Sequence, residues 1–368
     1  MKKKLIICIP SLRVGGAAKI ALNLTEQYLE DGMDVHLILT DGNSRDPDFR
    51  SLPAGLQLHK LPQRKMHHFI RPFINAYTLL KYFRKLQPDA ILAVRHDATV
   101  VSALAWWLYG RKGRFVIREI NPITKTLNRN AVMIALIRWA YRSASAVIAN
   151  STDVAEALKA KKWLDPAQIH TIDNPVLTKS FYQKASAKLD DPWLASNNSP
   201  LIVTIGRLDK MKDQATLIRA FAILRRQCPA RLMLIGDGPE ATNLQQLVTS
   251  LNLQDDVKLP GAMDNPYPIL KQAEIFVLSS RYEGFGNVLV EALSLGKKVI
   301  STACTGGPAY ILNHGEYGRL FPVGNHEALA AAMLAALVEA QDPAPLVNRA
   351  QHFSAARIAA AYAAVLFN

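Results

Sequence analysis

The chain has 368 residues, of which 49% are hydrophobic and 20% are charged, and its formal net charge is +14. This length suggests two domains, and the composition excludes a disordered chain and a collagen. Three cysteines are too few for a disulfide scaffold and fit a reducing compartment with free thiols.

Two further features bear on membranes and secretion. The six strand-like residues 5–10 that follow the N-terminal lysines are too short for the core of a signal peptide. The longest uncharged, mostly apolar stretch, residues 98–110, is well below the roughly 20 residues that span a bilayer. We therefore expect a cytoplasmic protein with no transmembrane segment.

The first half of the chain alternates between short apolar runs and longer helical runs. The expected strands are 5–9, 35–40, 90–94, 115–118 and 146–149, and the expected helices are 17–31, 73–86, 99–109 and 132–143. Such alternation predicts a parallel sheet that helices cover on both faces.

A second cycle of strands and helices follows a break at Asn174-Pro175 and a loose segment that continues to residue 200. Its expected strands are 201–205, 231–235, 257–259, 275–278 and 299–301, and its expected helices are 214–227, 245–251, 269–273, 288–295, 326–340 and 354–367. The sequence therefore predicts an α/β protein of two Rossmann-like domains, 1–175 and 176–353, whose parallel sheets face an interdomain cleft. The last helix, about 354–367, is compatible with packing back on the first domain.

The positive charge is concentrated in the first half. Residues 49–152 contain 17 basic residues and three acids, a net charge of +14, and aromatic residues are interleaved with them. This pattern fits a surface for anionic lipid headgroups, a solvated basic face over an ordinary core, or a nucleic-acid surface. We favour the anionic membrane surface, because nothing in the window specifies the reading of bases, and we expect no nucleic-acid partner.

Glycines and cations follow several of the expected strands. Gly15-Gly16 precedes a helix and lets a phosphate approach backbone N–H groups, although a tight turn alone explains it as well. Arg207 and Lys212 flank a loop after a strand, where two cations can clamp a diphosphate. Taken alone, Arg207 and Lys212 are more simply two loop cations in solvent.

Two glutamates lie eight residues apart, on either side of a glycine-containing turn and a helix start. Glu283 is on the loop, and Glu291 is about one turn into the helix. Carboxylates suit the hydroxyls of sugars and ribose, and the helix N-terminus between them suits a phosphate. A capping or salt-bridging role for Glu291 and a solvated Glu283 are the simpler alternative for an isolated pair.

The order and spacing of these motifs resemble the retaining GT-B glycosyltransferases of family 4, which act in bacterial surface-glycan and lipopolysaccharide synthesis. The resemblance covers essentially the whole chain and is strongest between residues 201 and 325. The matching motifs are Gly15-Gly16, Asn174-Pro175-Val176, Gly206-Arg207-Leu208 with Lys212, Gly236-Asp237-Gly238-Pro239-Glu240, Glu283 to Glu291, Gly306-Gly307-Pro308 and Gly315-Glu316-Tyr317-Gly318.

The resemblance implies a role for each donor-side residue. Arg207 and Lys212 would neutralise the donor diphosphate, Glu291 would hold the ribose, and Glu283 would contact the donor sugar as a catalytic residue. The resemblance also places Met263 near the base and makes the first domain the acceptor-binding one. Further donor contacts would come from Gly15, Gly16, Gly284, Phe285, Gly286, Asn287 and Val288.

The acceptor side is less defined. Arg95, His96 and Asp97 follow one expected strand, and Glu119 and Asn121 follow the next. In resembling enzymes the second position often carries a histidine near the reacting sugar, so Glu119 or Asn121 would take that place. His96 is a second catalytic candidate, and an inert loop histidine is an equal alternative.

The sequence departs from the family pattern at two positions. Ala18 stands where a glutamate is frequent, and Ala309-Tyr310 stands where related members have Arg-Glu. The first departure weakens any statement about acceptor orientation at that loop, and the second makes Tyr310 a specificity difference.

Together these patterns predict a hexosyltransferase (EC 2.4) that needs no cofactor and no metal. It would move a hexose or N-acetylhexosamine from a nucleotide sugar, more often UDP-linked, to a lipid-linked or oligosaccharide acceptor of lipopolysaccharide, O-antigen or another surface polysaccharide. Peripheral attachment to the inner face of the plasma membrane is expected. The alternatives are a nucleotide-sugar epimerase of GT-B type and a non-catalytic protein that binds anionic lipid.

Overall fold

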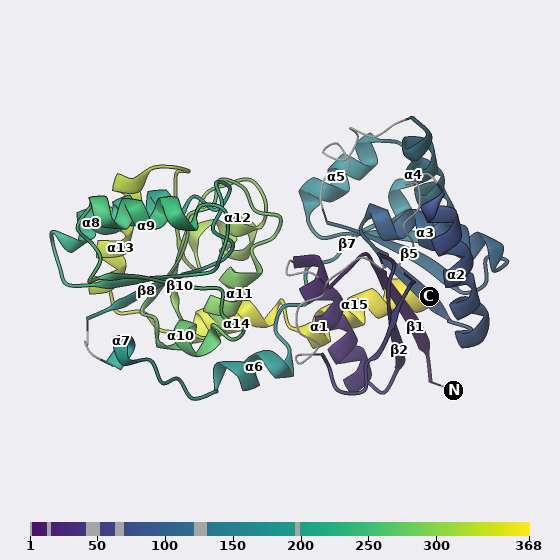
Figure 1. Ribbon diagram of the computed structural model, residues 1–368, viewed down its shortest axis with the longest axis horizontal. Coiled ribbons are helices and arrows are strands. Elements are labelled where there is room, and N and C mark those ends of the chain that lie inside the picture. The colour runs from purple at the N-terminus through teal and green to yellow at the C-terminus, as the bar shows by residue number, and fades with distance from the viewer. Residues whose placement is uncertain (1, 13–15, 42–51, 63–69, 121–130, 196–198) are drawn as a thin grey trace. The chain divides into compact units, whose positions relative to one another are not determined.

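The computed structural model describes the whole chain except residues 1, 13–15, 42–51, 63–69, 121–130 and 196–198. The described residues form two compact units (Figure 1). Unit 1 comprises Met1–Thr178 and Phe353–Asn368, and unit 2 comprises Lys179–His352. The first unit is therefore closed by the C-terminal end of the chain.

Within the described residues, unit 1 contains a sheet of seven parallel strands in the order β3-β2-β1-β4-β5-β6-β7. Its strands are β1 Lys4–Ile9, β2 Asp34–Leu39, β3 Gln57–Lys60, β4 Ala90–Val94, β5 Arg114–Glu119, β6 Ala146–Ala149 and β7 Ile169–Thr171. Its helices are α1 Gly16–Glu30, α2 Arg71–Leu86, α3 His96–Leu108, α4 Ala131–Ser143, α5 Thr152–Ala160 and α15 Ala355–Phe367, with the 3-10 turn η3 Pro166–Gln168.

Strands β4 and β6 are apolar along their whole length, and β1 and β5 are apolar in their middle, because helices cover both faces of a parallel sheet. One core holds Phe83 of α2, Trp106 of α3 and Tyr141 of α4. The opposite core holds Leu24 of α1 and Tyr362 of α15. Helices α2, α3 and α4 therefore cover one face of the sheet, while α1 and α15 cover the other.

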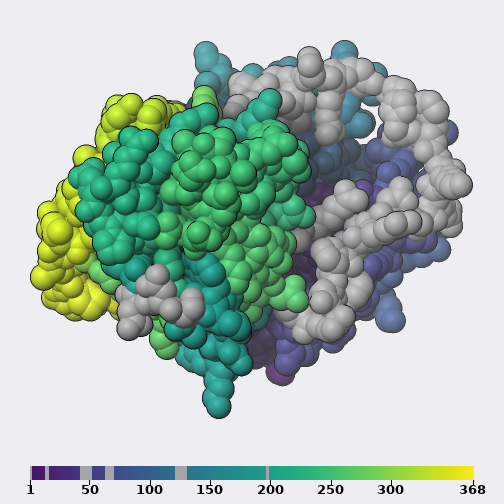
Figure 2. Space-filling view, turned by 60° about the vertical axis from the view of Figure 1, so that its left-hand side comes forward, coloured from purple at the N-terminus to yellow at the C-terminus, as the bar shows by residue number. Residues whose placement is uncertain are grey.

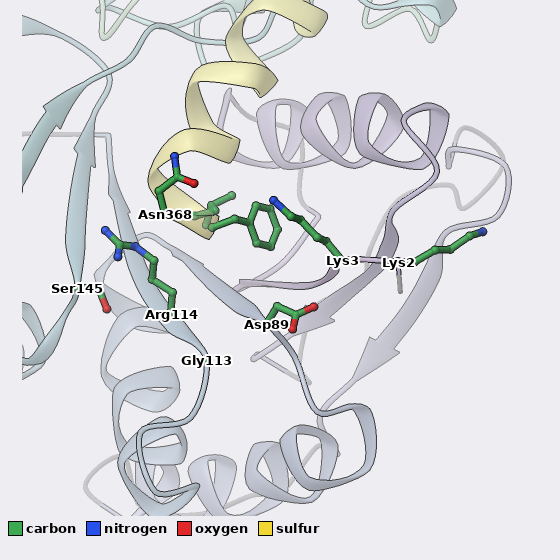
Figure 3. Close-up of a pocket in the computed structure, with 9 residues that line it drawn as sticks. Lys2, Lys3, Asp89, Gly113, Arg114, Ser145 and Asn368 are labelled. Atoms are coloured by element: carbon green, nitrogen blue, oxygen red, sulfur yellow. The ribbon is translucent and has the colours of Figure 1, made fainter.

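The returning helix α15 is bonded into unit 1 at both ends of its inner face. The Tyr28 hydroxyl donates to the carbonyl of Ala359 at 3.0 Å, and Arg114 Nε donates to the carbonyl of Val365 at 2.6 Å. Near the second contact lies a polar cavity of about 560 Å³ (Figure 3). Gly113, Arg114 and Asp89 border it, so it lies where β4 and β5 begin.

Unit 2 contains a sheet of six parallel strands among its described residues, in the order β10-β9-β8-β11-β12-β13. Its strands are β8 Leu201–Ile205, β9 Arg231–Ile235, β10 Val257–Gly261, β11 Ile275–Leu278, β12 Lys298–Thr302 and β13 Arg319–Phe321. Its helices are α6 Lys179–Ala185, α7 Pro192–Ala195, α8 Gln214–Arg225, α9 Ala241–Ser250, α10 Tyr267–Gln272, α11 Asn287–Ser294, α12 Gly307–Ile311, α13 His326–Val338 and α14 Ala344–Gln351, with the 3-10 turn η4 Asn313–Gly315.

The main core of unit 2 lies between the sheet and helices α8, α9 and α13. Phe221 of α8, Val248 of α9 and Met333 of α13 are fully buried there. The alanine-rich α13 packs along α8, and the two lie beside each other on the surface in Figure 2. The small alanine side chains of α13 permit this close approach.

Each sheet has a point where the chain reverses its direction of winding. In unit 1 the reversal falls between β1 and β4, and in unit 2 it falls between β8 and β11. Open α/β sheets bind their ligands beyond the carboxyl ends of the strands at this switch point. The loops after these four strands are therefore the first places to look for a site.

The predicted α/β class and the two Rossmann-like parallel sheets are confirmed. The sequence analysis missed β3, β7 and β13, which all lie at the edges of their sheets. An edge strand needs little apolar surface, and the sequences QLHK, IHT and RLF carry no buried alternating pattern. No helix among the described residues is long and apolar enough to cross a membrane.

Candidate active site

The switch point of unit 2 brings together two side chains that the sequence analysis selected. Lys212 lies on the loop after β8, and Glu283 lies on the loop after β11. Lys212 Nζ is 2.5 Å from Glu283 Oε1, while the two side chains are 25% and 9% exposed. The pair is thus largely buried, and the cation is the more accessible partner.

Three polar contacts join these two loops, two through the backbone and one between side chains. The hydroxyl of Ser279 donates to the carbonyl of Lys212 at 2.9 Å, and the amide of Arg281 donates to the carbonyl of Met211 at 2.8 Å. Arg281 Nε also lies 3.1 Å from Asp213 Oδ2. The loops therefore form one connected structure at the strand ends.

Ser280 orients the carboxylate of Glu283. Its hydroxyl donates to Glu283 Oε1 at 2.6 Å, and its own carbonyl accepts from the hydroxyl of Thr302 at 2.6 Å. Ser280 and Thr302 are both fully buried. The sequence analysis did not select Ser280, although two serines directly after a buried strand indicate polar contacts at the strand end.

Glycine is required where the neighbouring loops pass close by. A Cβ on Gly236 would lie 1.8 Å from the carbonyl oxygen of Gly206, and one on Gly306 would lie 1.8 Å from the carbonyl oxygen of Glu283. Both glycines also have positive φ, +151° and +112°. The glycine motifs after β9 and β12 thus bring those loops against the loops that carry Arg207 and Glu283.

Helix α11 starts directly after the Glu283 loop. Gly286, with φ +94°, precedes its first residue, Asn287, and the carbonyl of Gly286 accepts from the amide of Leu289 at 2.9 Å. Glu291 lies one turn inside the helix and is only 3% exposed. Gly284, Asn287 and Val288 are half-buried, and Phe285 is buried.

The remaining donor-side candidates of unit 2 are more exposed. The side chain of Arg207 is 70% exposed, and its Nε lies 3.8 Å from Asp209 Oδ2. Asp209 also accepts from the amide of Lys212 at 3.0 Å, which shapes the loop between the two cations. Met263 follows the edge strand β10 and is 36% exposed.

The switch point of unit 1 carries a different set. Gly16 is exposed and begins α1, while Gly15 lies outside the described residues. Arg95 has φ +71° directly after β4, and its Nη2 lies 3.6 Å from Asp97 Oδ2. His96 Nε2 lies 3.4 Å from Asp97 Oδ1, and His96 is half-buried while Arg95 and Asp97 are exposed.

Glu119 occupies a closed position at the end of β5. It is 3% exposed, and its carboxylate accepts a hydrogen bond from the Tyr141 hydroxyl and another from the amide of Ile120 at 2.9 Å. Burial and this carboxylate raise the pKa of Tyr141. Asn121, the other candidate here, lies outside the described residues.

The described residues contain no group of three or more histidine, cysteine, aspartate or glutamate side chains that could hold a metal ion. Positive charge at the unit 2 site comes instead from Lys212, Arg207 and the start of α11. Cys304 is buried nearby, and burial raises the pKa of its thiol. It is therefore a neutral neighbour of the Lys212–Glu283 pair.

Comparisons with known proteins identify the family of this chain. Residues 186–353 match the model of the family described as glycosyl transferases group 1, and residues 14–179 match that of glycosyltransferase family 4. A 4-alpha-N-acetylgalactosaminyltransferase of Campylobacter jejuni, acting on N-acetylgalactosamine-N,N'-diacetylbacillosaminyl-diphospho-undecaprenol, is 30% identical over 89% of this chain and 88% of that protein. The lipopolysaccharide core biosynthesis glycosyltransferase LpsE of Rhizobium meliloti is 27% identical over 87% of this chain and 84% of that protein.

Solved structures show the same fold. The HepE protein of Anabaena, in complex with UDP and glucose, has a TM-score of 0.77 at 22% identity and covers 99% of both chains. The lipopolysaccharide outer core galactosyltransferase WaaB, in its apo form, has a TM-score of 0.74 at 17% identity, also over 99% of both chains. The chain belongs to the group 1, family 4 glycosyltransferases of GT-B fold, and it is an enzyme that transfers sugars.

Proposed function

We propose that this enzyme is a retaining glycosyltransferase that moves a hexose or N-acetylhexosamine from a UDP-sugar to a growing surface glycan, such as lipopolysaccharide core or O-antigen. The observation that carries the proposal is the meeting of Lys212 and Glu283 at the switch point of unit 2. The names of the Campylobacter and Rhizobium relatives support the glycan pathway. The bound UDP of the Anabaena structure supports the nucleotide.

The donor diphosphate would bind to the cationic part of the site. Lys212 and the exposed Arg207 supply two positive charges, and the amides at the start of α11 supply hydrogen-bond donors. As the bond to the sugar breaks, negative charge grows on the leaving diphosphate. Fixed cations and amides stabilise this charge without a metal ion, because they need no reorganisation during the reaction.

The two glutamates would hold hydroxyl groups. Glu283, already oriented by Ser280, would accept hydrogen bonds from the donor sugar, and Glu291 would accept them from the ribose. Arrival of the diphosphate gives Lys212 a second anionic partner. Part of the Glu283 carboxylate is thereby released to the sugar, which couples diphosphate binding to sugar binding.

The acceptor would bind at unit 1, where Arg95, His96 and Asp97 follow β4 at the switch point. The Campylobacter relative is named for an acceptor on diphospho-undecaprenol, a membrane lipid. We therefore place the reaction at the cytoplasmic face of the plasma membrane, with the enzyme attached peripherally. Glu119 has a structural role in this proposal, since its carboxylate is buried against Tyr141.

The first test is thermal stabilisation of the full chain by UDP-, GDP-, ADP- and CMP-sugars, each with and without EDTA. A ligand that binds only the folded state raises Tm. At a concentration one hundred times its Kd it adds about 2.7 kcal/mol to the free energy of unfolding. We expect UDP-sugars to raise Tm equally in both conditions. A shift that EDTA abolishes would refute the metal-free site, and a shift with another nucleotide would correct the donor.

Glu291→Ala tests the donor site independently of the stability of the fold. We expect this variant to keep its Tm without ligand within a few degrees, and to lose the Tm shift with the nucleotide sugar.

Product analysis then defines the reaction. A new glycosidic bond with the donor's anomeric configuration supports retention, the opposite configuration refutes it, and an altered nucleotide sugar without acceptor indicates an epimerase.

A further inference from the structure

The outer surface of unit 1 has an uneven distribution of apolar side chains. Six large hydrophobic side chains are exposed among its described residues, and every one belongs to α2, α3 or α4 or directly precedes α2. They are Ile70, Phe73, Tyr77, Trp107, Leu108 and Val132. In unit 2 the exposed large hydrophobics are scattered over separate elements, which is ordinary for a protein surface. The grouping in unit 1 therefore needs a cause other than chance.

Helix α2 shows the pattern most clearly. Its inner face buries Leu79, Leu80 and Phe83 in the core. Its outer stripe runs through Phe73, 52% exposed, and Tyr77, 58% exposed, at helical spacing. The same stripe then continues into exposed cations, Lys81, Arg84 and Lys85. These aromatic rings lie away from the core, which Leu79 and Phe83 on the opposite side of the helix help to fill.

The next helix repeats this order of aromatic and cation. Trp106 points inward, and its indole N–H donates to the carbonyl of Gly113 at 3.0 Å, whereas Trp107 is 57% exposed. The exposed Arg111 and Lys112 follow directly. Gly113 has no space for a side chain, since a Cβ would lie 2.5 Å from the carbonyl oxygen of Pro88. The loop therefore presents these two cations from a fixed backbone.

The two helices present these residues together. Helix α2 packs along α3, on the same face of the sheet (Figure 1). We name their outward residues the aromatic–cationic face: Phe73, Tyr77, Lys81, Arg84, Lys85, Trp107, Arg111 and Lys112. The ends of both helices lead into the amino ends of β4 and β5, so the cations gather at one edge of unit 1.

Nearby acids do not neutralise this face. Three acids occur between residues 71 and 143, and each is held elsewhere. Asp89 accepts from the amide of Lys4 at 2.8 Å, Asp97 contacts Arg95 and His96, and Glu119 is buried against Tyr141. The face therefore combines net positive charge with exposed aromatic rings.

We propose that the aromatic–cationic face binds an anionic lipid bilayer and that this contact brings the enzyme to its membrane-borne acceptor. This proposal rests on the proposed function, because membrane contact assists the reaction only where the acceptor is carried by a membrane. Aromatic rings with a polar edge settle at the boundary of headgroups and acyl chains, while Lys and Arg attract anionic headgroups. Lys81 Nζ already lies 5.3 Å from the ring centre of Tyr77, so both groups approach the same depth.

The test is sedimentation of the full chain with two kinds of vesicle. One is pure phosphatidylcholine, and the other is phosphatidylcholine with about 30% phosphatidylglycerol. We expect binding to the anionic vesicles only, weakened at high salt because the cations are exposed. Lys81→Gln with Lys85→Gln should weaken it about tenfold or more, since each cation near such a surface contributes on the order of 1 kcal/mol. Phe73→Ser with Tyr77→Ser should weaken it by a similar factor.

A matched control removes the same charge elsewhere on unit 1. Lys159→Gln with Lys162→Gln alters two exposed lysines at the end of α5 and should leave vesicle binding unchanged. Equal losses in both lysine pairs would overturn the proposal in favour of a general charge effect. A concentration-dependent dimer that the Phe73 and Tyr77 changes abolish, without vesicle binding, would overturn it in favour of a second copy of the chain.

The failure of this proposal is distinguishable from failure of the proposed function. All the variants should keep the Tm shift with the nucleotide sugar, because none of these side chains belongs to the donor site of unit 2. Turnover of a detergent-free, water-soluble acceptor should also stay unchanged, while turnover of acceptor embedded in anionic vesicles falls. Loss of the Tm shift in the unaltered chain would refute the donor site and leave the vesicle result to stand by itself.

Discussion

Unit 2 joins Lys212 to Glu283 across two loops and leaves the cation partly exposed, whereas unit 1 buries Arg118 and Glu119 completely at the end of β5. Both arrangements lie near the carboxyl ends of parallel strands, the region where α/β sheets bind ligands. The difference lies in what the polar groups contact. In unit 2 the largely buried pair leaves its cation partly exposed at the switch point, and in unit 1 the polar groups meet core side chains.

Arg118 shows the buried type most clearly. It is 0% exposed, and it donates to the Tyr362 hydroxyl at 2.7 Å and to the Asn174 side-chain oxygen at 2.6 Å. These contacts tie β5 to α15 and to the segment that follows β7. A charged side chain near a strand end can therefore hold the fold together without touching a substrate, and the following substitutions test this contrast.

The largest effect is expected at Lys212. Lys212→Ala should lower turnover about a thousandfold, because it removes a fixed cation from the growing charge of the leaving diphosphate. Tm should also fall, because the largely buried Glu283 carboxylate loses its cation while Ser280 still donates to it. Steady-state kinetics and a melting curve measure the two effects.

Lys258→Ala is the control for Lys212→Ala. Lys258 is 34% exposed in its ion pair and lies 3.0 Å from Asp191, so this variant also loses an ion pair of unit 2. Its turnover should stay close to that of the unaltered enzyme. Equal losses of turnover in the two variants would contradict a specific role for Lys212.

Arg118→Ala should have the largest effect on stability. The change opens a cavity and leaves the Tyr362 hydroxyl and the Asn174 oxygen without their donor, which costs about 3 kcal/mol. Four of the five tryptophans, at positions 106, 107, 139 and 163, belong to unit 1. Urea unfolding followed by tryptophan fluorescence therefore reports mainly on this unit.

Donor binding provides the complementary readout for Arg118→Ala. The Tm shift with the nucleotide sugar should persist, because the donor site lies in unit 2. Arg118→Met, which keeps most of the volume, should lose less stability than Arg118→Ala. Unchanged unfolding together with lost turnover would instead make Arg118 a residue of the active site.

The sequence predicted the type of fold, and its motifs selected Lys212 and Glu283, which the structure brings together, because both follow from local patterns. Apolar runs identified the central strands, and the spacing from Glu283 to Glu291 identified a loop followed by a helix. The sequence could not distinguish Glu283 from Glu119, since both lie at or just beyond the end of a strand. The two glutamates differ in their partners. Glu283 contacts Lys212, 71 residues away in the chain, and Glu119 contacts Tyr141, 22 residues away.

Glu119→Gln tests that distinction directly. We expect turnover to stay within about twofold and stability to fall by about 1 kcal/mol, because the amide oxygen still accepts from Tyr141 while the NH2 group cannot accept from the amide of Ile120. Glu283→Gln should instead reduce turnover strongly and stability little. Kinetics and urea unfolding of both variants make the comparison. If Glu119→Gln abolished turnover in a stably folded enzyme, Glu119 would be catalytic and the contrast between the units would fail.

The smallest effect concerns the response of unit 1 to acid. His36 Nδ1 lies 3.1 Å from His59 Nε2, with the rings stacked, and His36 Nε2 lies 3.2 Å from Asp34 Oδ1. Burial lowers the pKa of His36, against the attraction of Asp34. Burial, followed by His36 and Lys85, lowers the pKa of His59.

Both imidazoles are therefore easier to protonate in the unfolded chain than in the folded one. Their contribution to stability is present above the ordinary histidine pKa of about 6.5 and is lost as pH falls below it. Tm of the tryptophan-detected transition should accordingly fall by a few degrees between pH 7.5 and pH 5.5, values of about one unit on either side of that pKa. His59→Gln keeps a side-chain amide beside His36 but cannot take up a proton, so it should reduce this pH dependence. An unchanged pH dependence in the variant would show that acid acts on unit 1 through other groups.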